Sequence, residues 1–292
     1  MRRVEGERTM NITELLATRG LNVNDRIKML RHQVSGYDLY DIYKQNLSHF
    51  EFLQCTQGKT RLNCNYVVSF IGAPHGHAVF VGVYEIKGAK PMSEVKPPRN
   101  FPYMELIDRT ETWYDMIRCK GYEDLIDRVV IDWGQSERSW HQWLKSDKPK
   151  EIVEIRPAGF VKHFPGFLEL SLNYADLKTM IRNPVANREW HILLKSVAGF
   201  YLILDRKTGK QYVGSAYGAD GILGRWRAYA ETGHGGNKQL IKKVNSSDDY
   251  PGSFTFSVLH TLPKSSTKDE ALEWERLFKN KLGTRAFGLN TN

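Results

Sequence analysis

Ala198-Gly199-Phe200-Tyr201-Leu202-Ile203-Leu204 and Gln211-Tyr212-Val213-Gly214-Ser215 are two short, mainly apolar segments with the composition of β-strands. A polar stretch, Asp205 to Lys210, separates them and carries a glycine near its end. Apolar runs joined by a short, glycine-containing polar turn are typical of a β-hairpin. We therefore expect Tyr201 and Tyr212 to lie on paired strands.

Two helices are expected after this hairpin. Arg225 and Tyr229 are four residues apart in the first, so their side chains share one helix face. The second spans Lys268 to Lys279. Its apolar stripe would pack on the sheet and consists of Ala271, Leu272 and Phe278.

Length and charge limit the class of protein. The 292 residues suffice for one large domain or two ordinary ones, and the net charge is +9. A basic excess favours polyanionic partners, because neutralising phosphates releases counterions. No apolar run approaches the ~18 residues of a membrane span, and no apolar stretch follows Met1-Arg2-Arg3, so neither a membrane segment nor a signal peptide is expected. The three cysteines are odd in number and lack CxxC spacing, which favours a reducing cytoplasm.

Within the first 190 residues the sequence changes from a pattern typical of helices to one typical of strands. Residues 1–48 are expected to be mainly helical, and residues 49–135 to be rich in β-structure. Expected helices cover residues 11–16, 24–33 and 38–47. Expected strands cover residues 50–53, 66–71, 78–86, 104–107, 125–126 and 129–133. This order predicts an α+β fold with a curved sheet or barrel in a domain of residues 1–190, and a second domain of residues 191–292.

Residues 196–292 resemble the GIY-YIG nuclease family. Gly199-Phe200-Tyr201 and Tyr212-Val213-Gly214 match the two triplets of that family, with apolar replacements at the middle positions. Arg225, Glu275 and Asn290 then follow in the family's order. The resemblance implies an α/β sandwich, in which helices flank a small antiparallel sheet, and an enzyme that hydrolyses phosphodiester bonds.

The resemblance also implies roles for the hairpin and the helix that follows. Arg225 would hold the scissile phosphate and offset charge in the transition state. Arg227, on another face of the helix, is the second candidate. Tyr229 stands where many family members carry histidine, so its part in proton transfer stays open. One of Tyr201 and Tyr212 would accept a proton from the attacking water, and the other would orient the water or the phosphate.

A single metal ion is implied as well. Family members bind one divalent cation through a helix glutamate, and Mg²⁺ (or Mn²⁺) suits a site with few protein ligands and several waters. Glu275 matches the family pattern best, while Glu273 and Glu270 are the competing carboxylates. Asn290 would brace the active site. Further residues expected to contact DNA are Lys210, Arg227, His234, Asn237 and Lys238.

The segment from Gly76 to Ile86 resembles the β-barrel of PUA-like domains, which include readers of modified bases. Aromatic residues of the first domain could form a pocket that stacks a base, or they could form its core. They are Trp113, Trp133, Trp140, Trp143, Tyr66, Tyr84 and Tyr103.

These expectations combine into one function. The chain would be a Mg²⁺-dependent endonuclease for double-stranded DNA, acting in restriction of foreign DNA and sensing modified bases through its first domain. A homodimer would allow breaks in both strands. The alternatives are a structure-specific repair or recombination nuclease, and a nucleic-acid-binding protein whose nuclease site has decayed.

Overall fold

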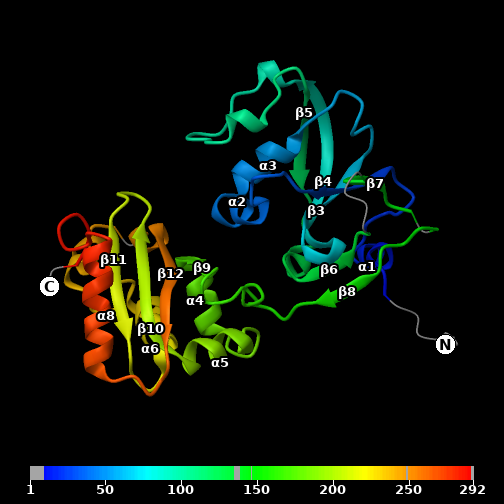
Figure 1. Ribbon diagram of the computed structural model, residues 1–292. Coiled ribbons are helices and arrows are strands. Elements are labelled where there is room, and N and C mark those ends of the chain that lie inside the picture. Colours follow the sequence, from blue (N-terminus) through cyan, green and yellow to red (C-terminus); the bar gives the residue numbers. More distant parts are fainter. Residues whose placement is uncertain (1–9, 135–138, 146, 248, 291–292) are drawn as a thin grey trace, which may run out of the picture. The chain divides into compact units, whose positions relative to one another are not determined.

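The computed structural model describes residues 10–134, 139–145, 147–247 and 249–290 and divides the chain into two compact units (Figure 1). Unit 1 is Met1–Arg156 and unit 2 is Pro157–Asn292. Met1-Arg2-Arg3, on which the signal-peptide expectation rests, falls outside the described residues. None of the described helices is long and apolar enough to cross a bilayer.

The boundary between the units differs from the expected position near residue 190. Residues 157–190 belong to unit 2, because strand β9 (Ser171–Asn173) pairs with strand β12 (Phe254–Leu262). Trp190 and Leu194 also lie in the same hydrophobic core as Tyr201. A strand of three residues leaves too little pattern in a sequence to reveal this pairing.

Unit 1 is built on an eight-stranded, curved sheet. Its main strand order is β2-β5-β4-β3-β1-β7, and β6 joins β4 to β8. One edge of β4 pairs with β3, while its other edge pairs first with β6 and then with β5, so the long strand bends between partners. The strands are β1 (Ile27–His32), β2 (Thr56–Gln57), β3 (Tyr66–Gly72), β4 (His77–Pro91), β5 (Thr112–Arg118), β6 (Val129–Asp132), β7 (His141–Trp143) and β8 (Ile152–Ile155).

The helices of unit 1 agree only in part with expectation. Helices α1 (Ile12–Thr18) and α2 (Leu39–Gln45) form where the sequence predicts them. The expected strand at 50–53 is wrong, because these residues belong to helix α3 (Leu47–Cys55), whose first turn is capped by the Asn46 side chain. The expected strands at 104–107 and 125–126 are wrong too, since Met104–Leu106 and Glu123–Leu125 form 3-10 turns.

The expected helix at 24–33 is strand β1. All six of its residues are buried, and it pairs in parallel with β3 and antiparallel with β7. A strand covered on both faces has no alternation of apolar and polar residues, so the periodicity of its sequence is uninformative.

Unit 2 contains a four-stranded antiparallel sheet of order β11-β10-β12-β9. Strands β10 (Ala198–Asp205) and β11 (Gln211–Ala216) form the predicted hairpin. In their register Tyr201 lies opposite Gly214, and Ile203 lies opposite Tyr212. The hairpin prediction is therefore confirmed, and together with the curved sheet of unit 1 it agrees with a mixed, α+β fold.

Helices cover both faces of this second sheet. Helices α4 (Tyr174–Arg182), α5 (Arg188–Ser196) and α6 (Gly221–Thr232) share a core with Tyr201. Helix α8 (Lys268–Lys281) packs on the opposite face, where the rings of Phe200 and Phe278 lie 5.6 Å apart. Successive residues of a strand point to opposite faces of the sheet. Helices α4, α5 and α6 therefore lie on the face of Tyr201, and helix α8 lies on the face of Phe200.

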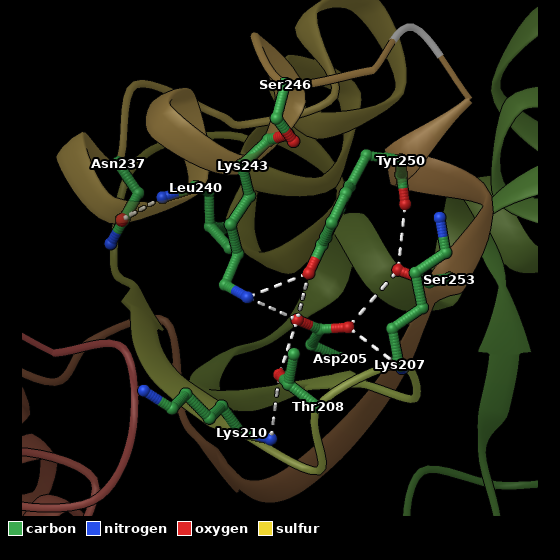
Figure 2. A network of polar contacts seen from close by, with 10 residues as sticks. All are labelled: Asp205, Lys207, Thr208, Lys210, Asn237, Leu240, Lys243, Ser246, Tyr250 and Ser253. Atoms are coloured by element: carbon green, nitrogen blue, oxygen red, sulfur yellow. Dashed lines mark hydrogen bonds and ion pairs between the residues drawn. The ribbon is translucent and has the colours of Figure 1, made fainter.

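A buried carboxylate fixes the end of the hairpin (Figure 2). Asp205 is fully buried. Its Oδ2 accepts hydrogen bonds from the Lys243 ammonium of helix α7 (Lys238–Val244) at 2.7 Å, the Tyr250 hydroxyl at 2.8 Å and the Thr208 hydroxyl at 2.7 Å. Its Oδ1 accepts from the backbone N–H of Lys207 at 3.0 Å. The turn, helix α7 and the segment before β12 are thus tied to one group.

Candidate active site

Tyr201 lies at the centre of an aromatic cluster between the hairpin and helix α6. It is fully buried, and its hydroxyl is 3.2 Å from the hydroxyl of Tyr229. Its ring lies 6.5 Å from that of Tyr212. A Cβ at Gly214 would stand 2.3 Å from the Tyr201 hydroxyl, so only glycine lets this ring lie across β11. The final glycine of the second triplet therefore has a steric cause.

Burial changes the acid–base chemistry of this cluster. Burial raises the pKa of Tyr201 to about 12, although the neighbouring Arg225 acts in the opposite direction. Burial also raises the pKa of Tyr229 well above its ordinary value. Both hydroxyls are therefore protonated at neutral pH, and in the bond between them one hydroxyl donates while the other accepts. Tyr212, the other tyrosine of the hairpin, is only partly buried.

The structure places one of the two candidate arginines beside the tyrosines. The guanidinium carbon of Arg225 lies 5.8 Å from the ring centroid of Tyr229. The neighbouring Tyr201 raises the pKa of Arg225, so its positive charge is secure. Arg227 lies on another face of α6, with its Nη1 3.8 Å from the carboxylate of Asp220. Arg225 is thus the arginine that can act with the tyrosine cluster.

Glu275 is tied to the hairpin from helix α8. Its Oε2 accepts a hydrogen bond from the Ser215 hydroxyl, and its Oε1 lies 2.6 Å from the ammonium of Lys279. The side chains of Glu275 and Lys279 are only 14% and 7% exposed. Of the competing carboxylates, Glu273 is exposed, and Glu270 accepts from the backbone N–H of Thr267 in a capping box.

Sequence reasoning missed Lys279 and Ser215. Lys279 stands four residues after Glu275 on the same helix, which is the spacing of a helical ion pair. Ser215 directly follows the second triplet. Both signals were present in the sequence, but neither residue type is part of the motif that drew attention to the region.

The expected site residues lie in two clusters on the two faces of one sheet. Tyr201 and Tyr212 face α6, where the ring of Tyr201 contacts those of both Tyr212 and Tyr229. Ser215 is an odd number of positions from Tyr212 on β11, so it faces α8 and Glu275. The structure thus brings the tyrosines together with Arg225, and brings Glu275 to the opposite face of the same edge strand.

Asn290 braces β11 along its outer edge. Its side-chain oxygen accepts from the backbone N–H of Val213 at 2.9 Å, and its amide donates to the Val213 carbonyl at 2.8 Å. The backbone N–H of Leu289 donates to the carbonyl of Gln211 at 2.8 Å. These bonds replace those of a neighbouring strand, so the position of Tyr212 depends on this late segment of the chain.

The glycine-rich loop after α6 covers the tyrosine cluster. A Cβ at Gly235 would lie 2.5 Å from the Tyr229 ring, so the loop backbone packs directly on it. The His234 Nδ1 accepts from the backbone N–H of Gly236 at 3.0 Å. Asn237 caps α7 by accepting from the backbone N–H groups of Gln239 and Leu240 (Figure 2). The side chains of His234 and Asn237 therefore stabilise the conformation of the loop itself.

The two lysines expected to contact DNA both lie at the surface of unit 2. Lys210 and Lys238 are exposed. Figure 2 shows the side chain of Lys210 extending away from Asp205, with only its backbone N–H directed to the Thr208 hydroxyl. Both ammonium groups are open to a polyanion.

Glu275, the carboxylate expected to bind the metal ion, already forms an ion pair with Lys279. No group of three or more His, Cys, Asp or Glu side chains with metal-binding geometry occurs among the described residues. A site with one carboxylate suits Mg²⁺, which keeps most of its waters. Here the ammonium of Lys279 already supplies positive charge beside Oε1 of Glu275. Glu275 fits a divalent cation only when Lys279 gives way.

Comparisons with known proteins give a limited likeness. No protein-family model matches the chain, and no curated protein matches it. Among solved structures, the catalytic domain of homing endonuclease I-TevI is similar with 26% identity and a TM-score of 0.27, over 32% of this chain and 98% of that chain. An alanine mutant of the catalytic domain of intron endonuclease I-TevI is similar with 25% identity and a TM-score of 0.28, over 33% of this chain and 94% of that chain.

Proposed function

We propose that this protein is a DNA endonuclease of the GIY-YIG type, with its nuclease site in unit 2. The observation that carries the proposal is the cluster in which Arg225 lies beside Tyr201 and Tyr229, while Gly214 makes room for the Tyr201 ring. The motif residues thus form a connected arrangement, with a steric reason for the glycine of the second triplet. The net charge of +9 supports a polyanionic substrate.

The proposed mechanism assigns one task to each group. Arg225 binds the scissile phosphate and stabilises the charge that develops on its oxygens. Tyr201 and Tyr229 stay protonated and donate hydrogen bonds, because burial raises their pKa values. Tyr212, at the accessible edge, orients the attacking water and takes its proton. Lys210 and Lys238 hold the flanking phosphates.

We also propose that Mg²⁺ (or Mn²⁺) binds Glu275 in exchange for the ammonium of Lys279. When bound, such an ion would stabilise negative charge on a phosphate oxygen at the edge strand β11, because Glu275 and Arg225 lie on opposite faces of the sheet and only this edge is open to both. Ser215 keeps the carboxylate in place in either state, because its hydroxyl donates to the other oxygen. Lys279 thereby sets how tightly the cation is held.

The test is a plasmid-nicking assay on matched arginine variants. Arg225→Ala should reduce the rate by roughly 100-fold or more, as removal of a donor to transition-state charge does. Arg227→Ala, on the other face of the same helix, should reduce the rate far less, because it removes at most one contact to the DNA backbone. Equal rates for the two variants, both shown to be folded by circular dichroism, would refute the assignment.

The finer proposals concern the biological role. They are restriction of foreign double-stranded DNA in the cytoplasm, sensing of modified bases by unit 1 and paired action in a homodimer. The sensing of modified bases is tested by measuring cleavage of matched DNAs that carry unmodified, methylated, hydroxymethylated or glucosylated cytosine. Equal cleavage rates on all four DNAs would refute this proposal. A repair nuclease would instead prefer branched DNA over linear duplex.

One observation favours a second function, a DNA-binding protein with a decayed nuclease site. The carboxylate of Glu275 is already neutralised by Lys279 at 2.6 Å. A protein that binds DNA but leaves plasmid intact with either Mg²⁺ or Mn²⁺ would establish this second function instead.

A further inference from the structure

Unit 1 contains a pocket beyond the end of strand β1. Its volume is about 290 Å³, at the lower end of the range for small-molecule sites, so it suits a single heterocycle. Phe50, Leu53 and Trp140 supply apolar and aromatic walls, while His32 and Gln57 add groups that form hydrogen bonds. Of the aromatic residues expected to stack a base, Trp133 and Tyr84 are buried in hydrophobic cores, and Trp140 lines this pocket.

His32 is a polar wall residue whose hydrogen bonding is incomplete. Its side chain is buried and its ring meets Phe50 edge-on at 5.1 Å, with Gln54 beside it. The Nε2 atom has no hydrogen-bond partner among the described residues. Burial lowers the pKa of His32 to about 4, so the imidazole is neutral at physiological pH. A buried polar atom without a partner destabilises the folded state, and a ligand with a matching group would recover the lost hydrogen bond.

A surface of cations and tryptophans adjoins the pocket. Lys28 and Arg26 lie over the ring of Trp143 at 4.9 and 5.6 Å, and the guanidinium of Arg61 lies 5.1 Å from the ring centroid of Trp140. Arg26, Arg61 and Trp143 are exposed. Alternating positive charges and aromatic faces bind the backbone and unstacked bases of nucleic acids.

Trp140 connects the two features, because it lines the pocket and also carries Arg61 on its ring. We propose that unit 1 binds one nucleobase, turned out of the DNA stack, in the pocket bounded by His32 and Trp140. Arg61, which lies over Trp140, holds a phosphate next to that nucleotide, and Arg26, at the other end of β1, holds a phosphate further along the strand. His32 forms a hydrogen bond with the edge of the base. This proposal rests on the proposed action on DNA and adds a position for the recognised nucleotide.

The test uses photo-crosslinking of the full chain to a short duplex that carries 5-iodouracil in a mismatch, because a mismatched base is the easiest to extrude. Peptide mapping should find the crosslink at Trp140 or Phe50. Val34 lines the same pocket and is 38% exposed, so Val34→Trp should fill the pocket without disturbing the core. It should reduce that crosslink at least 10-fold.

Two matched variants complete the design. Val185→Trp makes the same substitution at a site in unit 2 that is 89% exposed, and it should leave the crosslink unchanged. His32→Asn should reduce the crosslink several-fold while circular dichroism shows a native fold. A crosslink at Trp143 alone, or one that persists in Val34→Trp, would overturn the proposed pocket.

Plasmid cleavage, measured in parallel, separates this proposal from the proposed function. Cleavage without the Trp140 or Phe50 crosslink overturns the pocket alone. The crosslink without cleavage supports the pocket and overturns the nuclease. If neither plasmid cleavage nor the crosslink at Trp140 or Phe50 is observed, both proposals are overturned.

Discussion

Replacing Asp205 with asparagine should loosen the hairpin that carries the two tyrosines. The carboxylate is fully buried and accepts from Lys243, Tyr250 and Thr208 at 2.7–2.8 Å. Burial alone would raise the pKa of Asp205, but these donors outweigh it and lower the pKa to about 2 from an ordinary value of 3.8. The folded state therefore binds the ionised form much better than the unfolded state does.

The size of the effect follows from that difference. One pKa unit corresponds to 1.36 kcal/mol, so the ionised carboxylate contributes about 2 kcal/mol at neutral pH. Because the folded pKa is lowered, the contribution is present above pH 4 and is lost as the pH falls towards 2. Asp205→Asn removes it at pH 7 and adds no comparable loss at pH 2.

Hydrogen exchange with mass spectrometry measures this effect on the hairpin itself. Peptides from β10 and β11 should exchange roughly 30-fold faster in Asp205→Asn at pH 7, the equivalent of about 2 kcal/mol. Asp249→Asn is the matched control, because Asp249 is exposed and its side chain does not cap the 3-10 turn that follows it. Urea unfolding at pH 2 should no longer distinguish Asp205→Asn from wild type. Equal exchange at pH 7, or a stability difference that persists at pH 2, would refute the reasoning.

Three other predictions address the site. Gly214→Ala should lower the free energy of unfolding by about 1–3 kcal/mol and abolish plasmid nicking, because the new methyl group collides with the Tyr201 ring. Gly218→Ala is the control: its methyl group meets no atom within 4 Å, so thermal unfolding and nicking should both stay as in wild type. Absorbance at alkaline pH should show one tyrosine ionising only near pH 12, and Tyr201→Phe should remove that step; an unchanged titration curve would contradict the burial argument. Lys279→Met should tighten Mn²⁺ binding measured by electron paramagnetic resonance, while Glu275→Gln should abolish it, and unchanged affinity in both variants would place the metal elsewhere.

The hairpin was predictable because its information is local. Gly199, Tyr201 and Tyr212 lie within two short apolar runs, and one polar turn determines how the runs pair. The choice of Glu275 among three carboxylates agrees with its contact to Ser215. The role of these residues in catalysis stays a prediction.

Other features depend on contacts between distant segments. Strand β1 has the spacing of a helix, but its neighbours β3 and β7 bury it on both faces. The unit boundary depends on β9, which pairs with a strand about 80 residues later in the chain. Neither pairing leaves a signal within a window of ten or fifteen residues.

The bond between Asn290 and β11 has a consequence for how the protein is made. The two partners are separated by 77 residues in the chain. Until Asn290 has left the ribosome, the outer edge of β11 exposes backbone N–H and C=O groups that other chains can pair with. A chain shortened before Gly288 would keep that edge open permanently. Such a fragment should associate through it, even though both tyrosine triplets are intact.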